Sequence, residues 1–157
     1  MGNTNQKRIT FEAKYKHQLS SSELHDISNI SKSAFNHRNI HFKRDSIILC
    51  AYYGSRIIGI MGADMGRSDI PGEKDSSNIV FIYNFAVLPG YRNKKIGSEM
   101  LKRIFDYSTY KRMHTVELAV DANNFMAERL YKRFGFKKKY TYPDARRHVY
   151  RKRFSLE

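Results

Sequence analysis

The sequence predicts a mixed α/β fold, in which a sheet of about seven strands, hairpin-connected at both ends, is flanked by three or four helices. Three observations support this prediction. Short runs of β-branched, aromatic and other apolar residues recur along the chain, and such runs are typical of strands. In the middle of the chain these runs alternate with segments whose apolar residues have helical spacing, which is the order of βαβ units. Near both ends, turn residues join consecutive strands into hairpins.

The expected elements follow one another without an internal repeat or a linker. Strands are expected over residues 8–16, 46–53, 56–65, 79–88, 115–120, 136–142 and 148–154. Helices are expected over about residues 21–36 and 95–111, and from a cap within residues 121–124 to about residue 133. Residues 36–45 are expected to form a loop or a short further helix.

Local signals justify the first elements. The first strand alternates imperfectly in polarity. Ser20 and Glu23 then fit a capping box, in which each side chain satisfies an N–H group at the start of a helix. Apolar residues recur at helical spacing from Leu24 to Phe35. The Gly-Ser pair at residues 54–55 is a two-residue turn signal between two strong strand patterns and predicts a hairpin.

The central strand and helix carry the clearest pattern. The apolar run Ile79–Leu88 suits a buried strand, and Pro89 and Gly90 end it. A basic loop over residues 92–98 leads into the helix. The residues that share one face of this helix are Ile96, Met100, Leu101, Ile104 and Phe105. Because free N–H groups and the positive end of the helix dipole meet at the loop, we interpret it as a pyrophosphate cradle.

The last elements are shorter. Apolar residues alternate along the strand at 115–120. Residues 121–124 offer N-caps for the next helix, and Gly135 stands where a C-cap glycine is expected. A turn over residues 143–146 joins the final two strands.

Composition predicts one globular domain over residues 1–157. Hydrophobic residues make up 41% of the chain and aromatic residues 13%, which suits a buried core. No apolar run approaches the roughly 18–20 residues of a membrane span, and the first residues lack the apolar segment of a signal peptide. We therefore predict a cytoplasmic protein that does not associate with a membrane.

Positive charge is concentrated in the second half of the chain, whose total net charge is +14. Residues 1–90 hold 11 basic and 8 acidic side chains, a difference of +3, whereas residues 91–157 hold 18 and 7, a difference of +11. Such a surplus attracts a polyphosphate cofactor, an acidic substrate or nucleic acid, and charge alone does not choose among them.

Two motifs, about 30 residues apart, add specificity. Residues 87–97 follow the pattern V-x-P-x-x-R-G-x-G-[IL]-G, with Asn93 and Lys95 in place of two glycines. Residues 124–136 match every fixed position of N-x-x-A-x-x-L-Y-x-x-x-G-F. With the order of elements, these motifs resemble the GNAT N-acetyltransferase superfamily. Asparagine tolerates a positive φ, whereas Lys95 could either hinder the approach of the pyrophosphate or contact it.

The resemblance implies a transferase that moves an acetyl group from acetyl-CoA to a primary amine, by direct attack in a ternary complex. It implies that the backbone of Phe85, Ala86 and Val87 binds the pantetheine arm and the acetyl group. The residues implied to hold the pyrophosphate are Arg92, Asn93, Lys94, Lys95, Ile96, Gly97 and Ser98. Asn124 would reach the pantetheine chain, cap its helix, or do both, and Tyr131 would protonate the departing thiolate.

The general base stays unassigned. Many relatives place a glutamate on the strand before the cradle, where this chain has Tyr83 and Asn84. These two are candidates for the substrate side of the site, because either could hold an ordered water. Asp64, Glu117 and His148 are the other candidates, and an amine that arrives neutral would need no base. Cys50 is far from both motifs in the sequence, which argues against an acyl-cysteine intermediate.

Other interpretations remain open. His37 and His41 have helical spacing, but no cysteine or paired carboxylate nearby completes a metal site, so no metal is expected. The basic residues of 137–153 alternate with aromatic residues, and this segment forms either a solvated strand face or a surface for RNA. The alternative function is a non-catalytic module that binds CoA or RNA on the same fold, which the missing strand carboxylate and Lys95 favour. The amine acceptor is unidentified, an acidic or nucleic-acid-bound acceptor is possible, and the oligomeric state is not predicted.

Overall fold

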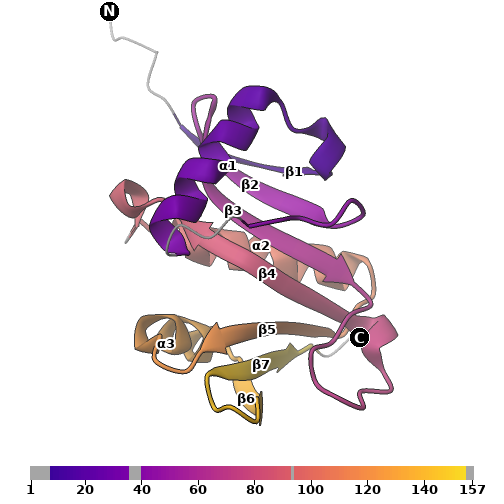
Figure 1. The fold of residues 1–157 in the computed structure, drawn as a ribbon. Helices are drawn as coiled ribbons and strands as arrows, with labels where there is room; N and C mark the ends of the chain where they lie inside the picture. Colours follow the sequence, from indigo (N-terminus) through magenta and orange to yellow (C-terminus); the bar gives the residue numbers. More distant parts are fainter. Residues whose placement is uncertain (1–7, 36–39, 93, 155–157) are drawn as a thin grey trace, which may run out of the picture. The chain divides into compact units, whose positions relative to one another are not determined.

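The computed structural model describes residues 8–35, 40–92 and 94–154 (Figure 1). The strands of this part are β1 (Ile9–Lys14), β2 (Ile47–Tyr53), β3 (Arg56–Met65), β4 (Ile79–Val87), β5 (Thr115–Asp121), β6 (Lys137–Thr141) and β7 (Arg147–Arg153). Its α-helices are α1 (Ser21–Ala34), α2 (Ile96–Tyr110) and α3 (Phe125–Arg133). Single 3₁₀ turns lie at Lys16–Gln18, Ser76–Asn78 and Pro89–Tyr91.

The strands form a seven-stranded sheet in the order β1-β2-β3-β4-β5-β7-β6. The pairs β1–β2, β5–β7 and β6–β7 are antiparallel, and β4–β5 is parallel with α2 as its crossover. The predicted mixed sheet with hairpins near both ends is thereby confirmed. Residues 40–45 form a loop, and residues 36–39 lie outside the described part. No described helix is long and apolar enough to cross a membrane.

The chain divides into two compact units, each with its own interior. Unit 1 comprises Met1–Gly62 and Asn84–Arg103, and unit 2 comprises Ala63–Tyr83 and Ile104–Glu157. Strands β3 and β4 and helix α2 therefore contribute residues to both units.

Helix α1 begins in unit 1 with the capping box that the sequence predicts. Ser20 Oγ accepts from Glu23 N at 3.1 Å, and Glu23 Oε1 accepts from Ser20 N at 3.0 Å. The Glu23 carboxylate is buried, where it also accepts from Lys14 Nζ at 2.9 Å and from the Tyr52 hydroxyl. Burial alone would raise the pKa of this carboxyl, but these hydrogen bonds outweigh it and lower the pKa to about 2.

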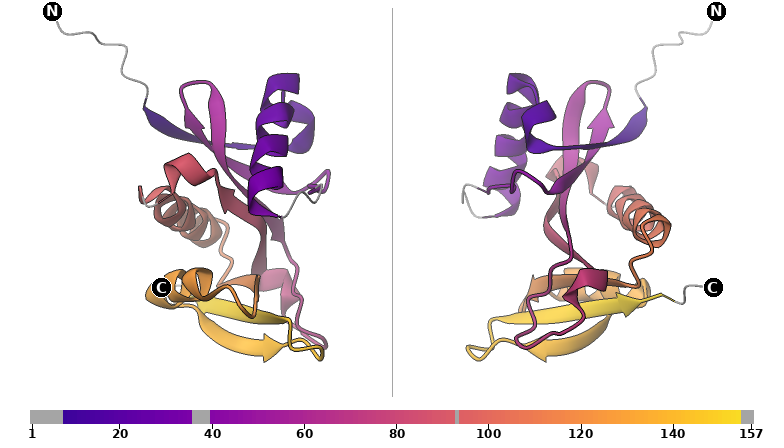
Figure 2. Two further views of the ribbon diagram at one scale, coloured as in Figure 1. Left: turned by 60° about the vertical axis from the view of Figure 1, so that its left-hand side comes forward. Right: turned by 90° about the vertical axis from the view of Figure 1, so that its right-hand side faces the viewer.

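Unit 2 is built around β5, which pairs with β7 from Thr115↔Arg153 to Asp121↔Arg147. Figure 2 shows α3 and the β6–β7 hairpin gathered beside β5 in both views. The rings of Phe134, Phe136 and Phe154 pack against Phe105 with centroids 5.4–6.2 Å apart. Helix α3 ends before Gly135, whose φ of +90° is the conformation expected of a C-cap glycine.

Candidate functional site

Strand β4 changes character along its length. Residues 79–82 are buried, and their parallel register with β5 runs from Ile79↔Thr115 to Ile82↔Leu118. Residues 83–87 are half-buried. The change coincides with Asn84, which has a φ of +51° inside the strand. A left-handed residue in a strand breaks the pleat and re-aims the backbone that follows, as in a β-bulge.

The conformation of Asn84 is supported by its own side chain. Its Nδ2 atom donates to the His41 carbonyl oxygen at 3.0 Å. Asparagine is one of the few residues that tolerate positive φ, because its short amide forms local hydrogen bonds. The backbone of Phe85, Ala86 and Val87 follows directly, and Leu88 N then donates to Ile58 O at 2.7 Å.

The loop after β4 is held by short-range contacts. Arg92 Nε donates to the Val87 carbonyl oxygen at 3.0 Å, so the guanidinium lies beside the end of β4. The Tyr91 ring packs on Tyr53 with centroids 5.5 Å apart, and Lys94 Nζ lies 5.9 Å from the Tyr91 centroid. Arg92, Lys94 and Lys95 are all exposed. Asn93 lies outside the described residues.

Helix α2 offers free donors at its start. Its first backbone bond runs from Glu99 N to Lys95 O at 3.0 Å, so the N–H groups of Ile96, Gly97 and Ser98 precede the helical ladder. Lys95 has a φ of +61°, and glycine is the residue that most readily adopts this conformation. The backbone here therefore has a conformation that suits glycine, and in this chain it carries a lysine side chain.

Packing fixes this helix end against the neighbouring strands of unit 1. Ile96, Met100 and Leu101 are buried. A Cβ atom on Gly59 of β3 would lie 3.2 Å from Met100 Sδ, 3.2 Å from Ala51 Cβ and 3.6 Å from Ala86 O. Gly59 thus lets α2 and the end of β4 approach β3 closely. Gly59 could not be identified from the sequence. A glycine inside a strand pattern can mark a close approach, but the pattern does not show which segment approaches it.

Together, the basic loop and the start of α2 have the chemistry that suits the phosphate groups of acetyl-CoA. An anion would meet the first N–H groups of α2, the positive end of the helix dipole, and the exposed cations Arg92, Lys94 and Lys95. The half-buried residues Phe85–Val87 come directly before this loop in the chain. These features all lie within unit 1.

The two site residues predicted from the second motif, Asn124 and Tyr131, belong to unit 2. Asn124 caps α3, because its Oδ1 atom accepts from Ala127 N at 3.2 Å, and its side chain is exposed. Tyr131 is 8% exposed and packs edge-on against Phe136 with centroids 5.6 Å apart. Burial raises the pKa of the Tyr131 hydroxyl, so the group is protonated at neutral pH.

The candidate bases have other partners. Asp64 pairs with Arg67 at 2.8 Å, and His148 Nδ1 lies 2.8 Å from Thr141 Oγ1. Glu117 is fully buried, and Arg151 Nε donates to it at 2.7 Å. These contacts are those of structural residues.

On the predicted substrate side, the Asn84 amide is engaged by His41, and the guanidinium carbon of Arg67 lies 5.6 Å from the Tyr83 ring centroid. Among the described residues, no group of three His, Cys, Asp or Glu side chains could hold a metal. His37, the partner of His41 in the spacing noted above, lies outside those residues.

Residues 12–136 match the model of the acetyltransferase (GNAT) family. Comparison of the sequence with curated proteins gave no significant match.

Several solved structures share the fold. PH1933 from Pyrococcus horikoshii has 22% identity and a TM-score of 0.73, with 94% of this chain and 100% of that chain covered. The ribosomal-protein-S18-alanine N-acetyltransferase from Escherichia coli has 16% identity and a TM-score of 0.70, with 94% and 96% covered. Arabidopsis thaliana Naa50, in complex with the bisubstrate analogue CoA-Ac-MVNAL, has 24% identity and a TM-score of 0.69, with 93% and 99% covered. The family model spans most of the sequence, and the chain therefore belongs to the GNAT family of acetyltransferases.

Proposed function

We propose that this chain is an N-acetyltransferase that transfers the acetyl group of acetyl-CoA to a primary amine. The observation that carries this proposal is the end of β4: a left-handed break at Asn84, then half-buried backbone, then a basic loop and the free N–H groups of α2. We also propose that both units serve one acyltransferase domain, because the family match at residues 12–136 includes segments of each.

In this proposal, unit 1 binds the acyl donor. Arg92, Lys94 and Lys95, with the N–H groups from Asn93 to Ser98, hold the pyrophosphate. The backbone of Phe85, Ala86 and Val87 holds the pantetheine arm, and one of its N–H groups polarises the thioester carbonyl as negative charge develops on the oxygen. Asn124 contributes a polar contact to the pantetheine chain.

The proposed chemistry is a direct transfer. The amine nitrogen attacks the thioester carbon, the carbon–sulfur bond breaks, and the amine loses a proton to solvent. Tyr131 donates its hydroxyl proton to the departing thiolate and then regains a proton from solvent, and its raised pKa keeps that proton in place at neutral pH. Burial also raises the pKa of the Cys50 thiol to about 12, which disfavours a nucleophilic thiolate and a covalent acyl-enzyme.

The acceptor is best sought first among peptide N-termini. One structural neighbour is the ribosomal-protein-S18-alanine N-acetyltransferase, and another, Naa50, is in complex with the bisubstrate analogue CoA-Ac-MVNAL. Both are precedents for a peptide or protein acceptor on this fold. A small amine and an aminoacyl-tRNA complete the panel. Release of the CoA thiol would be measured with acetyl-CoA and each acceptor, with the acetylated product identified by mass spectrometry.

The wild-type chain should release thiol with at least one acceptor, and Arg92→Ala should raise the KM for acetyl-CoA more than it lowers kcat. Lys102→Ala is the matched control, because Lys102 is an exposed cation of α2 beyond its first turn. Thiol release that is absent with every acceptor, while acetyl-CoA still raises the Tm, would favour the alternative of a CoA-binding module. The observation behind that alternative is that no carboxylate lies between Asp75 and Glu99.

A further inference from the structure

A pocket of about 610 Å³ is lined by residues of unit 2. Its charged lining comprises Glu73, Asp75, Lys137, Lys139, Arg151 and Arg153. Ile79, the first residue of β4, also lines it, whereas Phe85–Val87 are the last residues of that strand. The volume is that of a ligand site, but the lining is mainly polar, which favours an ionic ligand.

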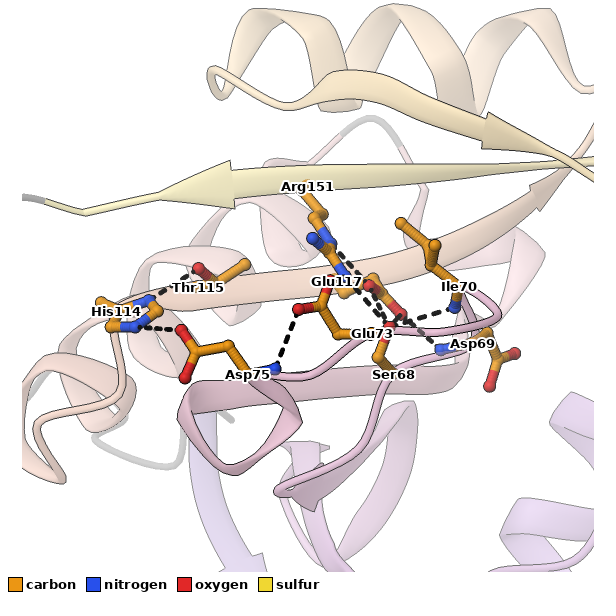
Figure 3. A network of polar contacts seen from close by, with 9 residues as sticks. All are labelled: Ser68, Asp69, Ile70, Glu73, Asp75, His114, Thr115, Glu117 and Arg151. Atoms are coloured by element: carbon orange, nitrogen blue, oxygen red, sulfur yellow. Dashed lines mark hydrogen bonds and ion pairs between the residues drawn. The ribbon is translucent and has the colours of Figure 1, made fainter.

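Two lining residues, Glu73 and Arg151, belong to a network of charged groups around Glu117 (Figure 3). Glu117 is fully buried and accepts hydrogen bonds from Ser68 Oγ at 2.8 Å, Asp69 N at 2.7 Å and Arg151 Nε at 2.7 Å. Arg151 Nη2 also donates to Glu73 Oε2 at 2.6 Å. Because two carboxylates face one guanidinium, this network carries no positive surplus.

His114 and Asp75 form a second pair among the lining residues. His114 Nε2 lies 3.0 Å from Asp75 Oδ2, and His114 Nδ1 lies 2.9 Å from Thr115 Oγ1 (Figure 3). The acidic groups of the lining, Glu73 and Asp75, are therefore both engaged by basic partners.

Three cations of the pocket remain. Lys137, Lys139 and Arg153 are exposed, and within the described part of the chain none of them has a carboxylate partner. Lys137 and Arg151 are direct cross-strand partners of β6 and β7, and Arg153 lies two residues further along β7. Unpaired cations that converge on one hollow repel one another, and a bound anion relieves that repulsion.

The spacing favours a chain of phosphates over an isolated anion. Two residues along a strand rise about 6.8 Å, so Lys137 and Lys139 of β6 are separated by roughly the distance between consecutive phosphates of a nucleic acid strand. Lysine and arginine are the side chains that bind phosphate oxygens through charge-assisted hydrogen bonds. We propose that the pocket between the loop at residues 67–78 and strands β5–β7–β6 binds phosphate groups, with single-stranded nucleic acid as the main source.

The test uses the full chain and a fluorescently labelled single-stranded ribo-oligonucleotide, titrated at several salt concentrations. The triple variant Lys137→Ala/Lys139→Ala/Arg153→Ala should weaken binding at least tenfold. It should also reduce the slope of log K against log salt by about 2, since each phosphate contact on a single strand contributes roughly 0.7. The matched control is Lys132→Ala/Lys138→Ala/Arg146→Ala, which removes three exposed cations of unit 2 that do not line the pocket.

Each outcome decides something. An equal loss in both triple variants would overturn the proposal, because only net charge would then matter, and so would a wild type that does not bind. Competition by inorganic triphosphate at stoichiometric amounts would identify free polyphosphate as the source, whereas its failure to compete would identify the nucleic acid strand. A glutamate-rich peptide that binds in the same pocket-dependent manner would exclude phosphate specificity.

The test is independent of acetyl transfer. Arg92→Ala, which alters the proposed acetyl-CoA cradle, should leave oligonucleotide binding within twofold of wild type. A large loss in this variant would assign the oligonucleotide to the cradle and contradict the pocket.

Discussion

Two residues with left-handed backbone, Asn84 and Lys95, flank the segment that ends β4 and begins α2. Asn84 has a side-chain bond to His41 O that supports its conformation. Lys95 has no such support among the contacts of the described residues, and a non-glycine residue in this region costs about 1–2 kcal/mol. The same residue places a positive charge at the N-terminus of α2, where it favours a bound phosphate.

Replacement of Lys95 by glycine should therefore remove the strained backbone conformation together with the positive charge, so that stability rises while phosphate binding weakens. Lys95→Gly should raise the free energy of unfolding by about 1 kcal/mol, because glycine adopts the positive φ without strain. Chemical denaturation measures this change. Lys94→Gly is the control and should be neutral or destabilising, since Lys94 does not have a positive φ. A loss of stability in Lys95→Gly would contradict the assigned strain.

Tyr131 gives the prediction at the level of chemistry. Tyr131→Phe keeps the buried ring against Phe136 but removes the proton donor. It should lower kcat about 10²-fold with little change in the KM for acetyl-CoA, as expected for a general acid. Steady-state kinetics check this split. Tyr140→Phe, which alters a half-buried tyrosine of β6, should retain wild-type kcat. A fall in Tm without a fall in kcat would make Tyr131 a packing residue only.

At the scale of elements, the start of α1 depends on one buried carboxylate. The folded-state pKa of Glu23 is lowered from 4.5 to about 2, so the ionised form stabilises the fold above pH 4.5. That stabilisation should be lost as the pH falls from 4.5 through 2. Glu23→Gln should cost about 2–3 kcal/mol at pH 7 and flatten the pH dependence over this window.

Urea denaturation from pH 2 to pH 7 measures that dependence. Glu12→Gln is the control, because Glu12 is exposed on β1 and should leave the pH dependence nearly unchanged. Parallel pH curves for Glu23→Gln and the wild type would contradict the role of the network around Glu23.

The approach of α2 to β3 gives a second prediction at this scale. Gly59→Ala would place a methyl group 3.2 Å from both Met100 Sδ and Ala51 Cβ. This overpacking should cost about 1–3 kcal/mol in the free energy of unfolding. Gly90→Ala is the control, because no atom lies within 4 Å of the added methyl group and the cost should be small. Equal stability of the two variants would show that the close packing at Gly59 is easily relaxed.

Much of this architecture could be predicted from local patterns. The strand expected over residues 79–88 is observed as Ile79–Val87, one residue shorter. It could be predicted because the apolar run and the proline that follows it mark its two ends. Likewise, Ser20 and Glu23 form the capping box that their spacing predicts. The sequence of residues 137–153 fits either a solvated strand face or an RNA surface. Local polarity does not choose between them, because the exposure of these side chains depends on how the loop at residues 67–78 packs against the strands.

Features that depend on tertiary contacts could not be predicted. The positive φ of Asn84 depends on a carbonyl group 43 positions away, and the burial of Glu117 depends on Ser68, 49 positions away. A pattern of neighbouring residues does not show which of these distant residues come into contact. The same limit applies to the general base, because a base is defined by what lies beside the acceptor amine and not by its position in the sequence.

At the scale of the whole molecule, the uneven charge now has two distinct parts. The cations of residues 92–95 lie at the start of α2, in unit 1. Lys137, Lys139 and Arg153 line a pocket in unit 2. If both proposals hold, the two groups bind phosphates of different molecules, and variants confined to one group distinguish them.

The central claim is that acetyl-CoA binds at the end of β4 and the start of α2, and hydrogen–deuterium exchange with mass spectrometry tests it most directly. Exchange would be compared with and without saturating acetyl-CoA. Peptides that cover residues 84–98 should become protected, because the N–H groups of this segment would donate to the thioester and the pyrophosphate. Saturable binding of acetyl-CoA that leaves the exchange of residues 84–98 unchanged would contradict this claim.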